Sequence, residues 1–235
     1  MAQLGRIAAA AAGLVALAGA ASAEVVVLNF EGINASYPSL DYAQVLNFYN
    51  GGTSNQATSG TNFGIGFSSN ALAICLNTPG NTSGCSNTSR GGQGDPGSAQ
   101  GGLFFLSGAE TFMNVPAGFD TGFSFFYTAV SQAGSVSVYD DLGGAGNLLA
   151  TIALPTTSIA CDGQFGAQFC PFVPVGVTFS GTAKSVSFAG AANQVVFDDV
   201  TFGSETPGTV PEPLSAALLG AGLVGLAALR RRRPA

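Results

Sequence analysis

The stretch SVSVYDDLGGAGNLLATIAL, residues 135–154, contains the pattern that decides the expected fold. In residues 135–138 serine alternates with valine, so one face of the extended chain is apolar and the other is small and polar. This alternation is typical of a strand with one buried face in an antiparallel sheet. The sequence DDLGG of residues 140–144 then predicts a hairpin loop, and residues 148–154 predict the partner strand.

Short apolar segments of the same kind recur along the chain, and most are bounded by Gly, Asn, Pro or Asp. The predicted strands are residues 25–30, 45–49, 63–67, 71–76, 103–106, 111–115, 122–128, 135–139, 148–154, 173–179, 185–188 and 195–202. No segment among them shows a sustained helical period with caps. Many short strands separated by turn signals predict an all-β fold, an antiparallel β-sandwich of jelly-roll type.

Residues 1–23 have the three parts of a secretory signal peptide. A short basic start precedes the apolar run 7–20, and small residues including Ala21 and Ala23 form the cleavage signal. The alternative, a buried core helix, is disfavoured because a strand-like segment follows at once. We therefore expect export, with an extracytoplasmic β-sandwich domain over residues 24–206.

Charge is distributed unevenly between the ends and the body of the chain. Residues 24–209 carry two cations against twelve acids, a net charge of −10, because five of the seven cations lie outside this segment. Binding to nucleic acid depends on Lys and Arg that neutralise phosphate charge. The acidic body therefore excludes nucleic acid as a partner.

All four cysteines lie in the part that is expected to be exported, where disulfides form. Their short spacings predict two local disulfides, out of three possible pairings: Cys75 with Cys85, and Cys161 with Cys170. A zinc site is the alternative. Zinc favours closer cysteine pairs or histidine partners, and the chain contains no histidine.

The C-terminal end combines a linker, an apolar segment and a basic tail. The linker 207–213 carries Pro211, Glu212 and Pro213, and the apolar residues 214–229 follow it. As a helix the apolar segment spans about 24 Å, which is short but feasible for a hydrocarbon core of about 30 Å. The tail 230–235 carries Arg230, Arg231, Arg232 and Arg233. Because positive charge favours the cytoplasmic side of a membrane, this tail is expected to be cytoplasmic, at the end of a transmembrane helix.

The order of motif, apolar helix and arginine cluster resembles the PEP-CTERM sorting signal of exported Gram-negative bacterial proteins. The body stretches VYDDLGGAGNLLATIALP, VPVGVTFSGTAKSVSFAGAANQVVFDDVTFG and GTNFGIGFSSNALAICLN are similar to recurrent segments of PEP-CTERM proteins. The resemblance implies that an exosortase recognises the chain and cuts near Pro211, Glu212 and Pro213. It also implies a transient inner-membrane anchor, a final place at the cell surface or in the extracellular matrix, and an association with exopolysaccharide and biofilm.

The sequence offers no complete catalytic set. Without histidine, neither a Ser–His–Asp nor a Cys–His arrangement can form. Carboxylate pairs can hydrolyse glycosides, but the candidate acids fall mostly in turns and the chain lacks tryptophan. The candidates are Glu110, Asp120, Asp140, Asp141, Asp198 and Asp199. We expect a non-enzymatic surface or matrix protein. A carbohydrate-binding module of the same matrix is the alternative, and a glycoside hydrolase is the third hypothesis.

Three acids are candidates for a structural calcium site: Glu31 directly after the first predicted strand, and Asp198 and Asp199 within the last. First and last strands of sandwiches are often neighbours, and carboxylate oxygens suit Ca²⁺. Carbohydrate-binding jelly rolls, which the body resembles in outline, commonly carry such a calcium. The alternative is that both aspartates flank a turn or face water, with one pointing inward and the other outward.

Most of the 18 phenylalanines and 5 tyrosines occupy apolar strand positions, where core packing explains them. Phe123, Phe125 and Tyr127 are examples. A few aromatic residues beside asparagines are instead candidates for a sugar-binding surface, namely Tyr42, Phe48 and Tyr49 with Asn47 and Asn50.

The disulfide prediction is tested by peptide mapping under non-reducing conditions. Peptides that join Cys75 to Cys85 and Cys161 to Cys170 are expected, because each pair is separated by a short loop in an oxidising compartment. A Cys75–Cys161 or Cys85–Cys170 peptide would show that the two loops meet in space instead.

Overall fold

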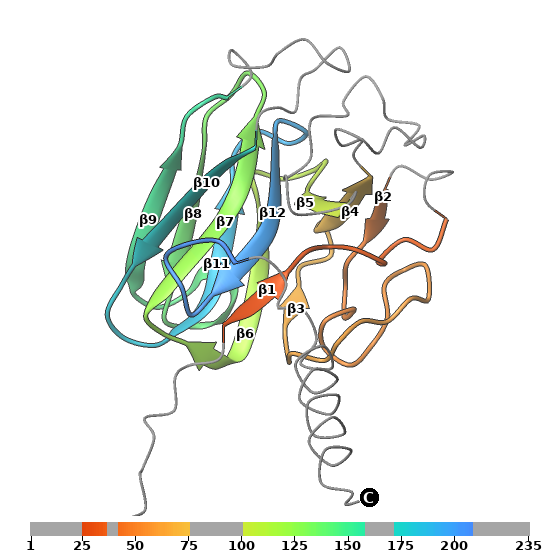
Figure 1. The fold of residues 1–235 in the computed structure, drawn as a ribbon, viewed down its shortest axis with the longest axis horizontal. Coiled ribbons are helices and arrows are strands. Elements are labelled where there is room, and N and C mark those ends of the chain that lie inside the picture. Colours follow the sequence, from red (N-terminus) through yellow and green to blue (C-terminus); the bar gives the residue numbers. More distant parts are fainter. Residues whose placement is uncertain (1–24, 37–41, 76–100, 158–171, 209–235) are drawn as a thin grey trace, which may run out of the picture.

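The computed structural model describes residues 25–36, 42–75, 101–157 and 172–208. Two antiparallel sheets pack against each other in this part of the chain, which confirms the predicted β-sandwich (Figure 1). No α-helix occurs among these residues, and their one helical turn is the short 3₁₀ segment η1 (Leu142–Gly144).

The larger sheet has β12 at its centre, between β7 and β5, and β1 pairs with β12 as well. Its strands in spatial order are β10 (Val173–Thr178), β7 (Gly122–Ala129), β12 (Val195–Phe202), β5 (Gly101–Phe104), β4 (Leu72–Cys75) and β2 (Tyr42–Gln44), with β1 (Val26–Leu28) beside β12.

The smaller sheet has five strands. They are, in spatial order, β3 (Gly66–Phe67), β6 (Glu110–Phe119), β11 (Ala183–Ala189), β8 (Gly134–Tyr139) and β9 (Leu148–Leu154). Strands β8 and β9 are antiparallel neighbours, so the hairpin predicted around residues 140–144 is confirmed.

The last eight strands pair from the outside inward: β5 with β12, β6 with β11, β7 with β10, and β8 with β9. Successive pairs lie alternately in the two sheets. This arrangement results when one long antiparallel ribbon wraps around a core, and it is the arrangement of a jelly roll. The wrapping makes the beginning and the end of the ribbon neighbours.

A phenylalanine-rich core joins the sheets. Phe188 of β11 and Phe197 of β12 meet with ring centroids 4.8 Å apart, and Phe125 of β7 contacts both of them. Such aromatic pairs contribute about 0.5–1.5 kcal/mol beyond the burial of their area. Phe123, Phe125 and Tyr127 are all buried, as the strand pattern predicts.

One predicted strand is wrong. Residues 46–50 form turns rather than a strand, and Leu46 has a positive φ of 49°. Phe48 and Tyr49 are nevertheless buried, at 5% and 4% exposure. A loop that contributes side chains to the core produces the same short apolar run as a strand, so the pattern cannot distinguish the two.

Several sequence predictions lie outside the described residues. These are the signal peptide 1–23, the motif and tail beyond residue 208, and Cys85, Cys161 and Cys170.

Cys75 ends β4, is fully buried and is not a free thiol, but its pairing with Cys85 stays a prediction. In the part of the chain that the structure describes, no helix is long and apolar enough to cross a membrane.

The first residue of β5 makes a contact that requires glycine. A Cβ on Gly101 would overlap the backbone carbonyl of Phe30, in the segment that follows β1. We expect Gly101→Ala to destabilise the fold by about 1–3 kcal/mol, which lowers the melting temperature by roughly 2–4 °C per kcal/mol in a domain of this size. Gly66→Ala is the matched control, because its Cβ would meet only the Asn50 side chain at 3.9 Å. Equal melting of the two variants would contradict this close approach.

Candidate functional site

Asp198 and Asp199 both lie inside the protein, at 1% and 2% exposure. The alternative in which these aspartates face water is therefore wrong. All eight residues of β12 are buried, because this strand lies in the middle of its sheet and both of its faces are covered. A strand buried on both faces does not alternate between protein and solvent.

A β-bulge changes the register of β12 at this pair. Asp198 lies opposite Phe126 and Thr201 opposite Ser124, so two residues of β12 share the position opposite Phe125. Asp199 has a positive φ of 44°, and its N–H donates to Asp198 Oδ1 over 2.7 Å. Bulges re-aim side chains, and this bulge accommodates two adjacent buried carboxylates.

Glu31 approaches the same region from β1. Leu28 of β1 lies opposite Val200 of β12, so the predicted proximity of the first and last strands is confirmed. The chain then turns at Phe30, whose φ is 55°, and the Glu31 carboxylate accepts a hydrogen bond of 2.6 Å from the Gly101 N–H. The half-buried Glu31 is thus fixed at the beginning of β5.

Tyr49 lies near enough to these acids for their charges to act on its phenol. Its buried hydroxyl accepts a hydrogen bond of 2.9 Å from the Phe30 N–H. Burial raises the pKa of the Tyr49 phenol far above its ordinary value, and this outweighs the opposite effect of that hydrogen bond. The negative charges of Asp198, Glu31 and Asp199 raise the same pKa further.

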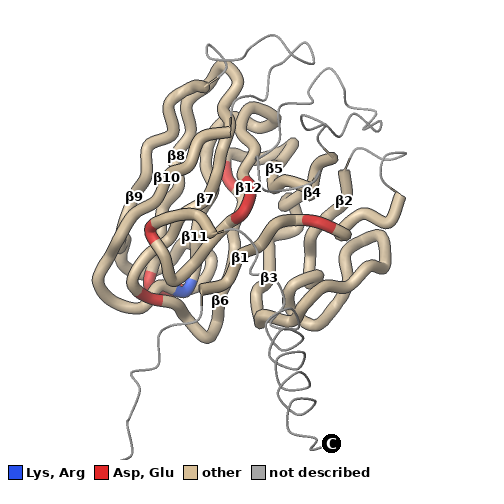
Figure 2. The backbone as a smooth tube through the Cα atoms, viewed as in Figure 1, with Lys and Arg blue, Asp and Glu red and all other residues tan. Residues whose placement is uncertain are grey.

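The charges of all three acids act on one buried phenol, and we call Glu31, Asp198 and Asp199 the acidic cluster. Figure 2 shows acidic positions in red on β12 and on the segment between β1 and β2. The sequence identified its members but not Tyr49, which was assigned to a sugar-binding surface. Tyr49 is 4% exposed and does not lie on a surface. A tyrosine in an apolar run gives no sequence signal for a contact with a segment 19 residues away.

The donor chemistry of the acidic cluster suits calcium, but the ligand geometry is incomplete. Glu31 Oε1 and Asp198 Oδ1 each accept a backbone N–H. Within the described ranges, no three Asp, Glu, His or Cys side chains form a group that could hold a metal ion. The calcium site stays a prediction, and its test closes this subsection.

The predicted sugar-binding surface does not form as one unit. Tyr42 is 46% exposed and Asn47 and Asn50 are exposed, whereas Phe48 and Tyr49 are buried. The two buried rings instead line a hollow of about 280 Å³ beside the acidic cluster, which we call the Tyr49 hollow. Its lining is Val27, Asn29, Glu31, Phe48, Tyr49, Gly60, Thr61 and Phe63.

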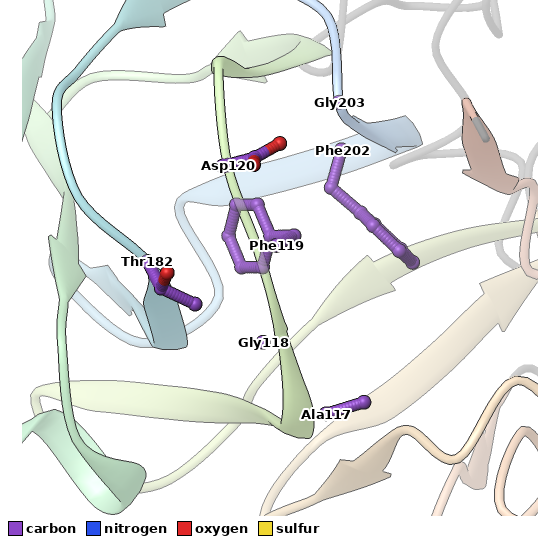
Figure 3. A pocket seen from close by; sticks show the side chains of 7 residues that line it. All are labelled: Ala117, Gly118, Phe119, Asp120, Thr182, Phe202 and Gly203. Atoms are coloured by element: carbon purple, nitrogen blue, oxygen red, sulfur yellow. The ribbon is translucent and has the colours of Figure 1, made fainter. Parts of the chain in front are cut away.

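A second hollow, of about 320 Å³, lies where three chain segments meet (Figure 3). The segments are the turn between β6 and β7, the turn between β10 and β11, and the end of β12. We call it the Asp120 hollow, and its lining is Ala117, Gly118, Phe119, Asp120, Thr182, Phe202 and Gly203. Asp120 is its one carboxylate.

The other candidate acids have structural partners. Glu110 accepts a hydrogen bond of 2.5 Å from the Ser187 hydroxyl, and Asp141 accepts one of 2.8 Å from the Leu142 N–H at the start of η1. Asp140 accepts bonds of 2.7 and 2.6 Å from the side chain and backbone of Asn147, which hold its pKa below the ordinary value. Asp140 and Asp141 thus organise the loop between β8 and β9, and Glu110 links β6 to β11.

No family model and no curated protein matches the chain. Among solved structures, the fold is similar to a carbohydrate-binding module from Cellvibrio mixtus lichenase 5A, determined with cellotriose. The identity is 17%, the match covers 46% of this chain and 79% of that chain, and the TM-score is 0.30. The fold is also similar to the K3 adhesin domain of Lys-gingipain from Porphyromonas gingivalis, at 17% identity and a TM-score of 0.30. This match covers 77% of this chain and 97% of that chain. At these values neither similarity carries an argument about function.

The calcium prediction is tested by thermal melting of the full chain in a non-ionic detergent, with Ca²⁺ or with chelator. An ion that binds only the folded state raises its stability, by about 2.7 kcal/mol at 100 times the dissociation constant. Asp198→Asn should remove most of this gain and leave the calcium-free protein nearly as stable, because Asn keeps an oxygen acceptor for the Asp199 N–H. Asp141→Asn, at the η1 cap, is the control of equal charge and should keep the gain. Identical melting in millimolar Ca²⁺ and in chelator would exclude the site.

Proposed function

We propose that this chain is an exported, non-enzymatic protein of the bacterial surface or extracellular matrix, sorted by an exosortase and associated with exopolysaccharide. The order of elements in the sequence carries the proposal: a signal peptide, an acidic β-sandwich, the motif at Pro211, Glu212 and Pro213, an apolar segment and an arginine cluster. The signal peptide alone suffices for export. The C-terminal elements therefore need a further purpose, and sorting through the inner membrane provides it.

The distribution of acids supports a non-enzymatic role. Glycoside hydrolysis uses two carboxylates about 5–10 Å apart on either side of the sugar. Among the residues that the structure describes, the Tyr49 hollow is lined by one carboxylate, Glu31, and the Asp120 hollow by one, Asp120. Neither of these two hollows supplies the pair that a glycosidase needs.

A carbohydrate-binding module of the same matrix is the second candidate. The observation that favours it is the Asp120 hollow, which combines polar groups with aromatic side chains. Ligand sites are typically concave and mostly apolar, with a few polar groups that orient the ligand. This candidate is compatible with the first, because a matrix protein can also hold a polysaccharide.

Sorting is tested by the intact mass of the protein recovered from the surface of a Gram-negative host that has an exosortase. The expected chain begins at residue 24 and ends near Pro211, Glu212 and Pro213. Replacement of the motif acid, Glu212→Gln, should leave the full-length chain in the inner membrane. Glu205→Gln removes the same charge outside the motif and should be processed normally.

One result would overturn the sorting proposal. If surface protein from the same host retains Arg230 to Arg233 and Ala235, the C-terminal segment is a permanent membrane anchor and exosortase does not act on it. The signal peptide would still explain the export of such a protein.

A further inference from the structure

The Asp120 hollow is a preformed feature of the sandwich (Figure 3). The Thr121 side chain donates to the Gly203 carbonyl over 3.1 Å, and the Gly203 N–H donates to Gly122 over 3.0 Å. Phe179 N–H also donates to the Thr121 carbonyl. These bonds fix the β6–β7 turn against the end of β12 and against the β10–β11 turn.

Aromatic rings form the apolar part of the hollow. Phe119 and Phe202 are 8% and 7% exposed, and their ring centroids are 5.4 Å apart. Phe119 also packs against Phe123 and Phe179. Rings held on several sides cannot move into the hollow, so the apolar contact surface that they offer is rigid.

Glycine keeps one wall of the hollow close-packed. Gly118 has a φ of 77°, and a Cβ there would lie 2.5 Å from the Thr182 methyl group. The backbone of β6 therefore approaches the β10–β11 turn directly, and the Thr182 side chain with its hydroxyl remains at the lining.

The Asp120 carboxylate gives the hollow its electrostatic character. Asp120 is exposed, and no described residue donates a hydrogen bond or forms an ion pair with its side chain. Lys184 is the one cation in the described ranges, and it acts on a different acid: its charge lowers the pKa of Asp140. Asp120 is therefore an acceptor for a ligand that brings its own donors.

The charge and size of the site define the ligand. The net charge of −10 over residues 24–209 repels acidic polysaccharides and attracts cationic ones. A volume of about 320 Å³ is at the lower end of ligand pockets, so the hollow has room for one ring-sized unit. A carboxylate beside an apolar surface and a hydroxyl matches a sugar ring that carries a protonated amine.

We propose that the Asp120 hollow binds one amino-sugar unit of a matrix polysaccharide. Asp120 pairs with the ammonium group, Phe119 and Phe202 contact the apolar side of the sugar ring, and the Thr182 hydroxyl bonds to a sugar hydroxyl. The choice of a polysaccharide rests on the proposed place of the protein in the matrix, because a lysine side chain presents the same ammonium chemistry. The experiment separates these two sources.

The test is calorimetric titration of the full chain in a non-ionic detergent, at pH 6 and low salt. The probes are glucosamine, N-acetylglucosamine, glucose and Nα-acetyl-lysine amide. We expect saturable binding of glucosamine at one site, and binding at least about tenfold weaker for the other three, because each lacks either the ammonium group or the sugar ring.

A pair of variants that remove equal charge locates the site. Asp120→Asn should weaken glucosamine binding by about tenfold or more, as expected when a charge-assisted hydrogen bond becomes a neutral one. Asp141→Asn removes the same charge at the η1 cap and should leave the affinity unchanged. Both variants should melt like the wild type, because Asp120 has no described side-chain partner and Asn at position 141 keeps an acceptor for the Leu142 N–H.

Four results would overturn the proposal. They are the absence of saturable binding at millimolar glucosamine, equal binding of glucose or N-acetylglucosamine, equal binding of the lysine amide, and equal losses in the two variants. Equal losses would mean diffuse attraction to the acidic surface. None of these results bears on cleavage at the motif, so failure of this proposal and failure of the sorting proposal are distinguishable.

Discussion

Burial of β12 along its whole length is the constraint on which the rest of this structure depends. The strand pairs with β7 and β5 on its two sides, and β1 pairs with it as well. Its inward Phe197 meets Phe188 of the opposite sheet and so joins the two layers. Burying two aspartates in such a strand costs free energy, because their carboxylates leave water. The bulge at Asp199 and the hydrogen bond from the Asp199 N–H to Asp198 Oδ1 offset part of this cost.

The two hollows show how one acidic chain creates two different environments. At the acidic cluster, burial raises the pKa of the Tyr49 phenol, and the three nearby negative charges raise it further. At the Asp120 hollow a single carboxylate faces solvent. The first environment holds the oxygen donors of the predicted calcium site, and the second is the proposed place of an exchangeable ligand.

The strands of the wrapped ribbon could be predicted from sequence because alternation and turn residues agree there. Residues 135–139 and 148–154 become β8 and β9 with the predicted hairpin. Alternation does not predict the structure where burial is not periodic. Residues 45–49 have strand-like composition, but residues 46–50 form turns that bury Phe48 and Tyr49. Strand β12 is covered on both faces, so alternation along it does not separate protein from solvent at its aspartates. The lining of the Asp120 hollow comes from three segments that are far apart in the sequence, and only the topology brings Asp120, Thr182 and Gly203 together.

The pairing of Val26 with Phe202 also has a mechanical consequence. Because β1 and β12 are antiparallel, the first and last described strands begin and end at the same pole of the sandwich. A force applied to the chain beyond residue 208 therefore pulls on the end of a central strand, not an edge strand. Such tension loads the hydrogen bonds of β12 to β7, β5 and β1 together and in shear, so three strand interfaces resist the extraction of β12 from the sandwich.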